Sequence, residues 1–438
     1  MKPSSVTLEQ MLDARERRAQ AQKELLLHAD GNACLVSLSL NIAGGVKRTP
    51  KTRLLFDRAM KVFESFGFFE ISRLITDAVT GTEALILLNR DPYAVKRSLE
   101  RLEDSFPAGR LLDFDVLNGS GEKLSRAVPR RCLVCDGPAA ICARSRAHGL
   151  DAVLEATETL LNGFAADTLA YTAHFALIRE LHTTPKPGLV DDMNNGAHTD
   201  MDIPLFEKSA ASLVPYFRQA ALAGIADAGM EALKAQGLNA ERAMFSATDG
   251  VNTHKGMIYS MGLLLYGMGR ALETGCDARE AAAELARTDA ASRLKGAARL
   301  KGTNGGAVYA KTGAKGAIGE AAEGFPHAAA CAEHLRSYES IGASAPGALA
   351  LCDTMAVLSD TNVLHRGGEE GLAFVQAEAE RISSLPVSER VAALTELDYE
   401  LIRRNLSPGG AADILALAYL LNAWKELSAH LFTTEDCL

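Results

Sequence analysis

The pattern of apolar residues changes near residue 150, and this change restricts the fold of the 438-residue chain more than any other feature. Before it, short apolar runs such as "ACLVSLSLNIAG" and "EALILLN" alternate with amphipathic segments, which predicts strands and helices in turn. After it, Ala- and Leu-rich segments keep helical spacing between glycine-rich polar loops. We therefore predict a multidomain protein, with a mixed α/β domain over residues 1–150 and an all-α domain over residues 151–438.

Local signals place several elements of the first half. Helices are expected over about 7–29 and 50–66, and another begins at Pro92 behind the N-cap Asp91. The run "FFEISRLITDAV" is typical of a strand, as is "EALILLN". The runs "GRLLDFDVL" and "EKLSRAV" are expected to pair as a hairpin through "NGSG".

Composition excludes some classes of protein. A hydrophobic content of 47% with 23% charged residues is typical of a folded globular chain, and the net charge of -9 argues against a nucleic-acid partner. The charged N-terminus lacks a signal-peptide pattern, and the apolar stretches 257–269 and 414–424 are too short to span a membrane. We expect a cytoplasmic protein with no membrane partner, whose eight cysteines are reduced thiols or metal ligands.

Two carboxylates in the first half have the spacing of a metal pair. Asp113 and Asp115 lie two apart in a predicted strand, so both face the same side. Two carboxylate ligands suit Mg²⁺, which leaves room for substrate phosphate and fits nucleotidyl transfer. The alternative is a solvated strand face. Basic residues of the same domain are candidate phosphate ligands, namely Lys47, Arg110, Arg126 and Arg131.

A second candidate metal site follows. Cys132, Cys135, Cys142 and His148 form a C-x2-C-x6-C-x5-H pattern, and the first pair has zinc-site spacing. Four nitrogen and sulfur ligands would complete a tetrahedral zinc site. The alternative is a set of ordinary reduced cysteines.

The second half contains a long polar loop, "HTTPKPGLVDDMNNGAHTDMD", from His182 to Asp202. Its two prolines keep Lys186 out of a helix. Carboxylates near a lysine suit a Mg²⁺–triphosphate site, and a solvated acidic loop with helix-capping aspartates is the alternative. The candidates for metal binding, charge and proton transfer are Lys186, Asp191, Asp192, His198, Asp200 and Asp202.

Four further polar junctions favour the nucleotide site. The stretch "GVNTHKG" precedes an apolar helical run, so a helix N-terminus, a hydroxyl and a lysine could together bind phosphate. It lacks the spacing of a P-loop. The stretches "KGAIGEAAEGFP", "SDTNVLHRGG" and "SPGGAADILALAY" are similar. Candidate ligands at these junctions are Asn252, Thr253, His254, Lys255, Glu320, Asp360, Asn362, Arg366, Gly409 and Gly410.

The first half resembles a known family in three motifs, "SLSLNIAGGVKRTP", "GRLLDFDVLNGSGEKLSR" and "RRCLVCDGPAAICARSRAH". They are similar to the apo-citrate lyase phosphoribosyl-dephospho-CoA transferase family, also called holo-citrate lyase synthase. The resemblance covers most of residues 7–150 and implies transfer of a phosphoribosyl-dephospho-CoA group to a serine of the citrate lyase acyl carrier subunit, with release of pyrophosphate. It makes Asp113 and Asp115 the metal pair. Ala43 departs from the family, which commonly has proline there.

The second half resembles triphosphoribosyl-dephospho-CoA synthase over roughly 165–430, through "TTPKPGLVDDMNNGAHTDMD", "GVNTHKG", "GAIGEAAEGFP" and "SPGGAADILA". The resemblance implies that ATP and 3′-dephospho-CoA give triphosphoribosyl-dephospho-CoA and adenine, by attack of a ribose hydroxyl on C1′ of ATP. Ile318 stands where the family pattern suggests an arginine, and Lys311 or Lys315 could replace that contact.

Together the two resemblances describe consecutive steps of citrate lyase maturation. Attack on C1′ requires a base for the hydroxyl, with His198 or His254 as candidates, and an acid for the departing adenine. Two alternatives remain. The same chemistry could serve malonate decarboxylase, or the chain could be a non-catalytic nucleotide-binding scaffold.

Overall fold

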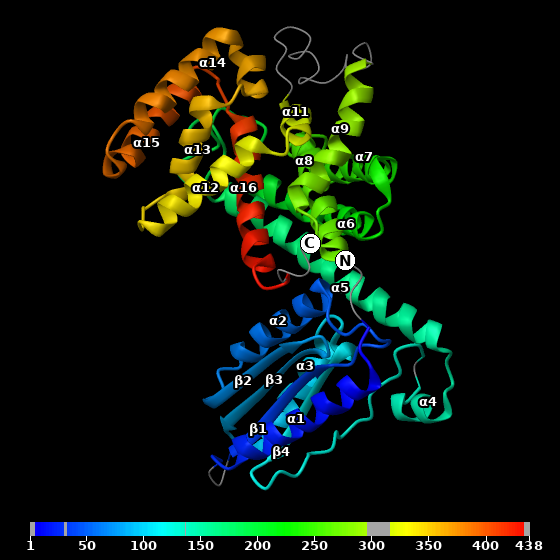
Figure 1. Ribbon diagram of the computed structural model, residues 1–438. Coiled ribbons are helices and arrows are strands. Elements are labelled where there is room, and N and C mark those ends of the chain that lie inside the picture. The colour runs from blue at the N-terminus through cyan, green and yellow to red at the C-terminus, as the bar shows by residue number, and fades with distance from the viewer. Residues whose placement is uncertain (1–4, 30–32, 136, 296–315, 433–438) are drawn as a thin grey trace. The chain divides into compact units, whose positions relative to one another are not determined.

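The computed structural model describes residues 5–29, 33–135, 137–295 and 316–432. The chain packs as two compact units (Figure 1). Unit 1 comprises residues 1–165 with 430–438, and unit 2 comprises residues 166–429. The domain boundary expected at residue 150 coincides with the first residue of a long helix, Leu150–Leu181, whereas the compact units meet at Ala165.

Unit 1 is a small antiparallel sheet covered by helices. Its strand order is β2-β3-β1-β4. Its elements are α1 (Leu8–Leu26), β1 (Ala33–Leu40), α2 (Pro50–Ser65), β2 (Glu70–Ala78), β3 (Gly81–Asn89), α3 (Pro92–Ser105), the 3₁₀ turn η1 (Gly109–Leu111), β4 (Leu112–Asn118), α4 (Ala139–Ser145) and the first half of α5 (Leu150–Leu181).

The central strand β1 is buried on both faces because helices cover both sides of the sheet. Leu35 packs with Leu85 and Leu87 under the C-terminal half of α1. On the opposite face, Phe114 of β4 stacks on Phe63 of α2 with ring centroids 6.3 Å apart. Figure 1 shows α1 and α2 on opposite sides of the strands.

The elements expected in the first half are largely confirmed, including the cap of α3 by Asp91, whose carboxylate accepts the Ala94 N–H at 2.7 Å. The hairpin after β4 forms its turn, but the predicted strand "EKLSRAV" is wrong. Pairing is limited to the single bridge between Leu117 and Lys123. The chain then leaves the sheet because Arg126 binds acidic residues of α3.

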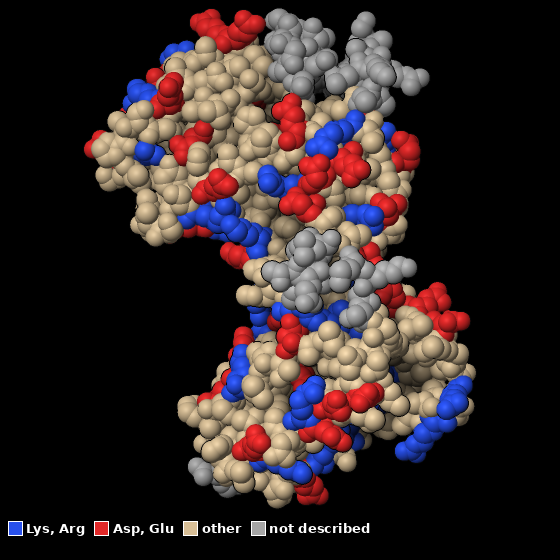
Figure 2. Space-filling view, viewed as in Figure 1, with Lys and Arg blue, Asp and Glu red and all other residues tan. Residues whose placement is uncertain are grey.

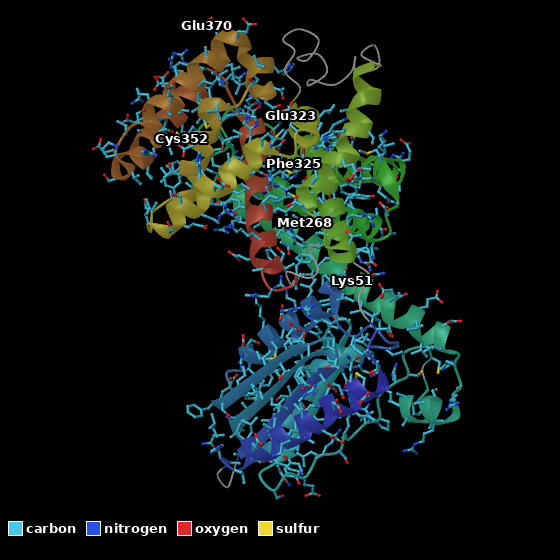
Figure 3. All side chains as sticks on the ribbon, viewed as in Figure 1. Lys51, Met268, Glu323, Phe325, Cys352 and Glu370 are labelled. Carbon is cyan, nitrogen blue, oxygen red and sulfur yellow. The ribbon has the colours of Figure 1, made fainter. Side chains whose placement is uncertain are left out.

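The first half of α5 belongs to unit 1. Lys51, labelled in Figure 3 near the start of α2, is buried and donates to Glu158 and, at 2.7 Å, to Asn162. The buried ammonium group therefore has two partners, as burial of a charge requires.

Among its described residues, unit 2 consists of helices joined by loops and contains no strand, as predicted. No described helix of the chain has the length and apolar character that crossing a bilayer requires. The elements are the second half of α5, α6 (Ile203–Ile225), α7 (Gly229–Ala247), α8 (Lys255–Thr274), α9 (Ala278–Lys295), α11 (Gly316–Ala322), α12 (Pro326–Ser340), α13 (Pro346–Val357), α14 (Thr361–Ser383), α15 (Val387–Arg403) and α16 (Gly409–Ser428).

Helices α8 and α16 form the interior of unit 2. Most residues of α8 and half of those of α16 are buried, including Met268, which Figure 3 labels on α8. Gly269 lets α8 approach α6 closely, since a Cβ there would lie 2.2 Å from the Ala221 carbonyl oxygen. This packing holds the N-terminal ends of α8 and α16 in fixed positions beside the polar loops.

Candidate functional site

The Asp113–Asp115 pair has the predicted geometry. Leu112, Phe114 and Val116 are buried, so the two carboxylates share the other face of β4. Helix α1 also covers part of that face, and its Arg18 donates to Glu83 of β3 at 2.8 Å. The two carboxylates of β4 stay accessible. Their side chains are 42% and 28% exposed.

Each carboxylate of the pair faces a cation. Lys123 Nζ lies 2.6 Å from Asp115, and an Arg130 nitrogen lies 3.2 Å from Asp113. Arg126 and Arg130 also bind the buried Glu103, whose pKa is raised by burial despite these partners.

Arg110 stands apart within this basic group. Its Nε is buried and makes no hydrogen bond among the described residues. Burial, followed by repulsion from Arg130 and Arg126, lowers its pKa. A buried guanidinium nitrogen without a hydrogen-bond partner, in the turn that leads into β4, suits an anionic substrate.

Two basic candidates of the first half lie elsewhere. Lys47 donates to the Ile42 carbonyl and lines a separate hollow of about 310 Å³ together with Arg15. Burial, then repulsion from Arg15, lowers the pKa of Lys47. Arg131 pairs through its backbone with Pro138.

Cys132, Cys135, Cys142 and His148, here called the thiol–imidazole cluster, are brought together as the spacing predicted. One ligand atom from each lies within 4.8 Å of all the others. The Val134 N–H donates to Cys132 Sγ at 3.4 Å and lowers the pKa of this thiol to about 7.

The second half encloses a cavity of about 1330 Å³ within unit 2. It is larger than the roughly 300–1000 Å³ typical of a single small-ligand site. The predicted residues that line it are Lys186, His198, Asp200, Asn252, Thr253, His254, Lys255, Glu320, Asp360, Asn362, Arg366, Gly409 and Gly410. The polar loop and the distant helix ends therefore form one site.

Lys186 is the most buried cation of this site, with 2% of its side chain exposed. Its Nζ lies 2.6 Å from Glu180 Oε1, at the end of α5. Its backbone N–H donates to Asp191 Oδ2 at 2.9 Å. Lys186 thus lines the cavity from a loop whose backbone is held in place by the buried Asp191 carboxylate.

Three aspartates of the loop that the sequence suggested as site residues do not line the cavity. Asp191 is buried and accepts the N–H groups of Met193 and Asn194 as well as that of Lys186. Asp192 pairs with His182 at 2.7 Å, and Asp202 caps α6. None of the three lines the cavity, which favours local structural roles over metal binding.

His198 is fixed on both sides. Its Nε2 lies 2.9 Å from Ser407 Oγ, and its Nδ1 lies 3.2 Å from a nitrogen of Arg366. Burial, then Arg366, lowers its pKa. Asp200 lies 3.9 Å from the same ring and is largely exposed. His198 therefore links the polar loop to the starts of α14 and α16.

His254 is held by one ring nitrogen. Nδ1 lies 2.6 Å from Ser209 Oγ, which also contacts Thr253 at 2.6 Å. Burial, then Lys186, lowers the His254 pKa to about 4, so the imidazole is neutral near pH 7. At the first residue of α8, Lys255 Nζ lies 3.0 Å from Glu241.

Asp360 joins two helix ends. Its buried carboxylate accepts N–H groups at the start of α14 and, at 2.9 Å, the Ala411 N–H of α16. A Cβ at Gly410 would lie 2.9 Å from this carboxylate, and one at Gly409 would lie 2.6 Å from Asn362. These glycines therefore allow the two helices to meet, a packing role that the sequence did not indicate.

The α11–α12 junction completes the wall. Glu320 accepts the Ala328 N–H at 3.0 Å and contacts His327 at 2.7 Å. Ile318 lines the cavity with an apolar side chain where the family pattern suggests arginine. Figure 3 labels Glu323, another lining residue, at this junction. The candidate replacements Lys311 and Lys315 lie outside the described residues.

Sequence reasoning missed three acidic residues. Asp413 of α16 lines the cavity, and burial, then Glu180 and Asp360, raises its pKa to about 8. Glu180 is the partner of Lys186, and Asp398 accepts from Gly188 N at 2.8 Å. One signal was available, since Asp413 is the single charged residue in the apolar run 411–424.

Charge on the surface is mixed. On the face drawn in Figure 2, basic and acidic residues are interspersed over both units. On that face, charge is therefore not gathered into one broad basic surface of the kind that attracts polyanions.

Comparison with known proteins identifies both halves. Residues 6–164 match the CitX family, described as apo-citrate lyase phosphoribosyl-dephospho-CoA transferase. Residues 166–431 match the CitG family, described as ATP:dephospho-CoA triphosphoribosyl transferase.

Whole proteins show the same arrangement. Protein CitXG of Haemophilus influenzae is 36% identical and covers 96% of this chain and 97% of its own. Protein CitXG of Leuconostoc mesenteroides is 28% identical over 95% of this chain and 97% of its own. A 2-(5''-triphosphoribosyl)-3'-dephosphocoenzyme-A synthase of Haemophilus ducreyi is 36% identical over 65% of this chain and 97% of its own. The chain therefore belongs to the CitXG family, in which the CitX transferase and the CitG synthase are fused.

Proposed function

We propose that unit 2 makes triphosphoribosyl-dephospho-CoA from ATP and 3′-dephospho-CoA, and that unit 1 attaches the phosphoribosyl-dephospho-CoA group to the acyl carrier subunit of citrate lyase. The observation that carries the proposal is the large cavity of unit 2. It gathers Lys186, Lys255, Arg366 and the N-terminal end of α8 in a volume that can hold two nucleotide substrates.

The triphosphate of ATP binds at the basic side of this cavity. Asp360 already accepts N–H groups at the starts of α14 and α16, whereas at the start of α8 Asn252 Oδ1 accepts the Lys255 N–H at 3.3 Å, so we assign phosphate to the N–H groups of α8 that follow Lys255. Lys186 and Lys255 offset the phosphate charge by exchanging their partners Glu180 and Glu241 for the ligand.

The chemical step is glycosyl transfer, in which the 2′-oxygen of dephospho-CoA bonds to C1′ of ATP and the C1′–N bond to adenine breaks. His254 accepts the hydroxyl proton, because its ring is neutral and Ser209 binds only Nδ1. Asp413 donates a proton to the departing adenine, because its raised pKa keeps it protonated near neutral pH.

Mg²⁺ fits the two sites differently. Asp113 and Asp115 offer two accessible carboxylates on one strand face, which suits the ion together with substrate phosphate. Among the described residues, the thiol–imidazole cluster is the one group of three or more acidic, Cys or His side chains close enough to share an ion. In unit 2, the triphosphate would carry Mg²⁺ with it, and Asp200, which is largely exposed and lines the cavity, would be the acid that helps to hold the ion.

Unit 1 acts as a nucleotidyltransferase in this proposal. The carrier serine oxygen bonds to the phosphorus that links the phosphoribosyl group to pyrophosphate, and the bond to pyrophosphate breaks. Mg²⁺ at Asp113 and Asp115 would neutralise charge on the reacting phosphates. Arg110, whose Nε has no hydrogen-bond partner among the described residues, would bind the same phosphates.

The test separates the two activities. Incubation with ATP, Mg²⁺ and dephospho-CoA should release adenine, and ADP or AMP without adenine would refute the synthase assignment. Asp113→Ala should abolish carrier modification and leave adenine release intact. Modification of the malonate decarboxylase carrier in preference to the citrate lyase carrier would favour the alternative pathway.

A further inference from the structure

The thiol–imidazole cluster has the dimensions of a tetrahedral metal site. The Cys135 and Cys142 sulfur atoms lie 3.6 Å apart. Ligands about 2.3 Å from a zinc ion at tetrahedral angles place two sulfur atoms about 3.8 Å apart. A disulfide requires about 2.05 Å, so the observed spacing fits a shared ion and not a bond between the sulfurs.

The fourth ligand lacks a partner within the protein. His148 Nε2 is buried and makes no hydrogen bond among the described residues. Buried polar atoms are nearly always satisfied, so this nitrogen requires an explanation. A ring nitrogen of His148 is one of the four converging ligand atoms, and coordination to a cation would satisfy it.

The backbone is folded around the sulfur atoms. The Cys132 N–H donates to the Gly137 carbonyl at 2.7 Å, which closes the short loop that carries the first two thiols. A Cβ at Gly137 would lie 3.4 Å and 3.6 Å from the sulfur atoms of Cys135 and Cys142. Glycine therefore leaves the space beside these two sulfurs open.

The surrounding segment has no apolar core of its own. Among its described residues, none from 125 to 149 is buried, and α4 contributes no buried side chain. Ordering the backbone of this segment costs conformational entropy that burial of apolar side chains does not offset here. Binding of a structural zinc ion is coupled to folding and would supply stabilisation of another kind.

We propose that the thiol–imidazole cluster binds a structural zinc ion that orders the 126–148 segment. Zinc also fixes the base of that segment, since Arg130 and Arg131 directly precede Cys132. Arg130 binds Glu103 and Asp113, so the ion acts as a positioning group for the acidic pair. The metal site itself stands independently of the proposed function, whereas this positioning role rests on it.

The experiment measures metal in the full-length protein, purified under reducing conditions without chelator. Elemental analysis should find one zinc per chain, and the double variant Cys135→Ser/Cys142→Ser should lose it. Cys276→Ser, which removes an exposed thiol of unit 2, is the matched control and should keep it. Cobalt added to the apoprotein should give the thiolate charge-transfer and visible bands of tetrahedral coordination.

Limited trypsin digestion reads the ordering role. Cleavage after Arg130, Arg131, Arg144 and Arg146 should be slow with zinc and fast after chelation or in the double variant. Adenine release should persist in that variant, which shows that unit 2 remains folded. Wild-type protein that holds no zinc and gives no tetrahedral cobalt spectrum would overturn the proposal, as would iron in place of zinc or a Cys135–Cys142 disulfide in the reduced protein.

Discussion

Replacement of Asp413 by asparagine tests the proposed acid most directly. With a pKa of about 8, the carboxyl is about 90% protonated at pH 7. Above the pKa, its protonated fraction falls about tenfold per pH unit. The wild-type profile of kcat/KM for adenine release should therefore fall above about pH 8. Loss of a general acid lowers the rate by about 10²–10⁴-fold, and Asp413→Asn should show a decrease of that order.

The same variant, although less active, should be less sensitive to rising pH in its free energy of unfolding than the wild type. Because burial raises the folded-state pKa above the unfolded value of 3.8, the native protein binds more protons than the unfolded chain between these values. Its stabilisation is present below pH 4 and is lost as pH rises through about 8. From pH 6 to pH 8 the wild type should lose about 2 kcal/mol through this group, and Asp413→Asn should not.

Both readouts are accessible in unit 2. Trp424, the single tryptophan, lies on α16 with Asp413, so its fluorescence follows unfolding of the same helix in urea. Glu426→Gln removes an exposed carboxyl from that helix and is the matched control. Adenine release within threefold of wild type in Asp413→Asn, or an unchanged alkaline limb in its residual activity, would refute the reasoning.

Three further predictions follow from individual contacts. Lys186→Met should lower the free energy of unfolding of unit 2 in urea by about 3–5 kcal/mol, because it leaves the buried Glu180 unpaired. The double variant Lys186→Met/Glu180→Gln should recover most of that loss. Equal stability of the single and double variants would contradict this prediction. Gly410→Ala should lower the melting temperature, since its Cβ would lie 2.9 Å from the Asp360 carboxylate, whereas Ala412→Gly in the same turn serves as a comparison without that clash. Arg110→Gln should raise the KM of carrier modification by at least tenfold while adenine release stays constant; an effect on both activities would show that Arg110 has a structural role beyond unit 1.

Short-range patterns in the sequence predicted the parts of the structure that depend on neighbours along the chain. Alternation in β4 placed Asp113 and Asp115 on one face, and the cysteine spacing predicted the cluster that the fold brings together. The failed strand "EKLSRAV" shows the limit of such patterns. Its residues have strand character, but ion pairs from Arg126 and Arg130 to Glu103, more than 20 residues away, draw the chain off the sheet.

The polar loop shows the same limit at the level of single residues. A loop that packs into a protein must satisfy its own backbone groups, and part of its polar side chains is used for that purpose. Asp191 accepts three backbone N–H groups, and Asp398 from α15 accepts that of Gly188. The density of acidic residues in the loop therefore could not distinguish the carboxylates that fold the loop from those that face the cavity.

That distinction depends on which groups share a cavity, and the cavity is assembled from helices far apart in the sequence. Asp413 lies in a run that resembles an ordinary core helix, where a carboxyl is costly to bury. The cost is tolerated here because burial, then Glu180 and Asp360, raises the pKa of this carboxyl and keeps it neutral at the wall of the cavity. A charged residue in an otherwise apolar core helix is thus a stronger indicator of chemistry than another aspartate in a loop already rich in them.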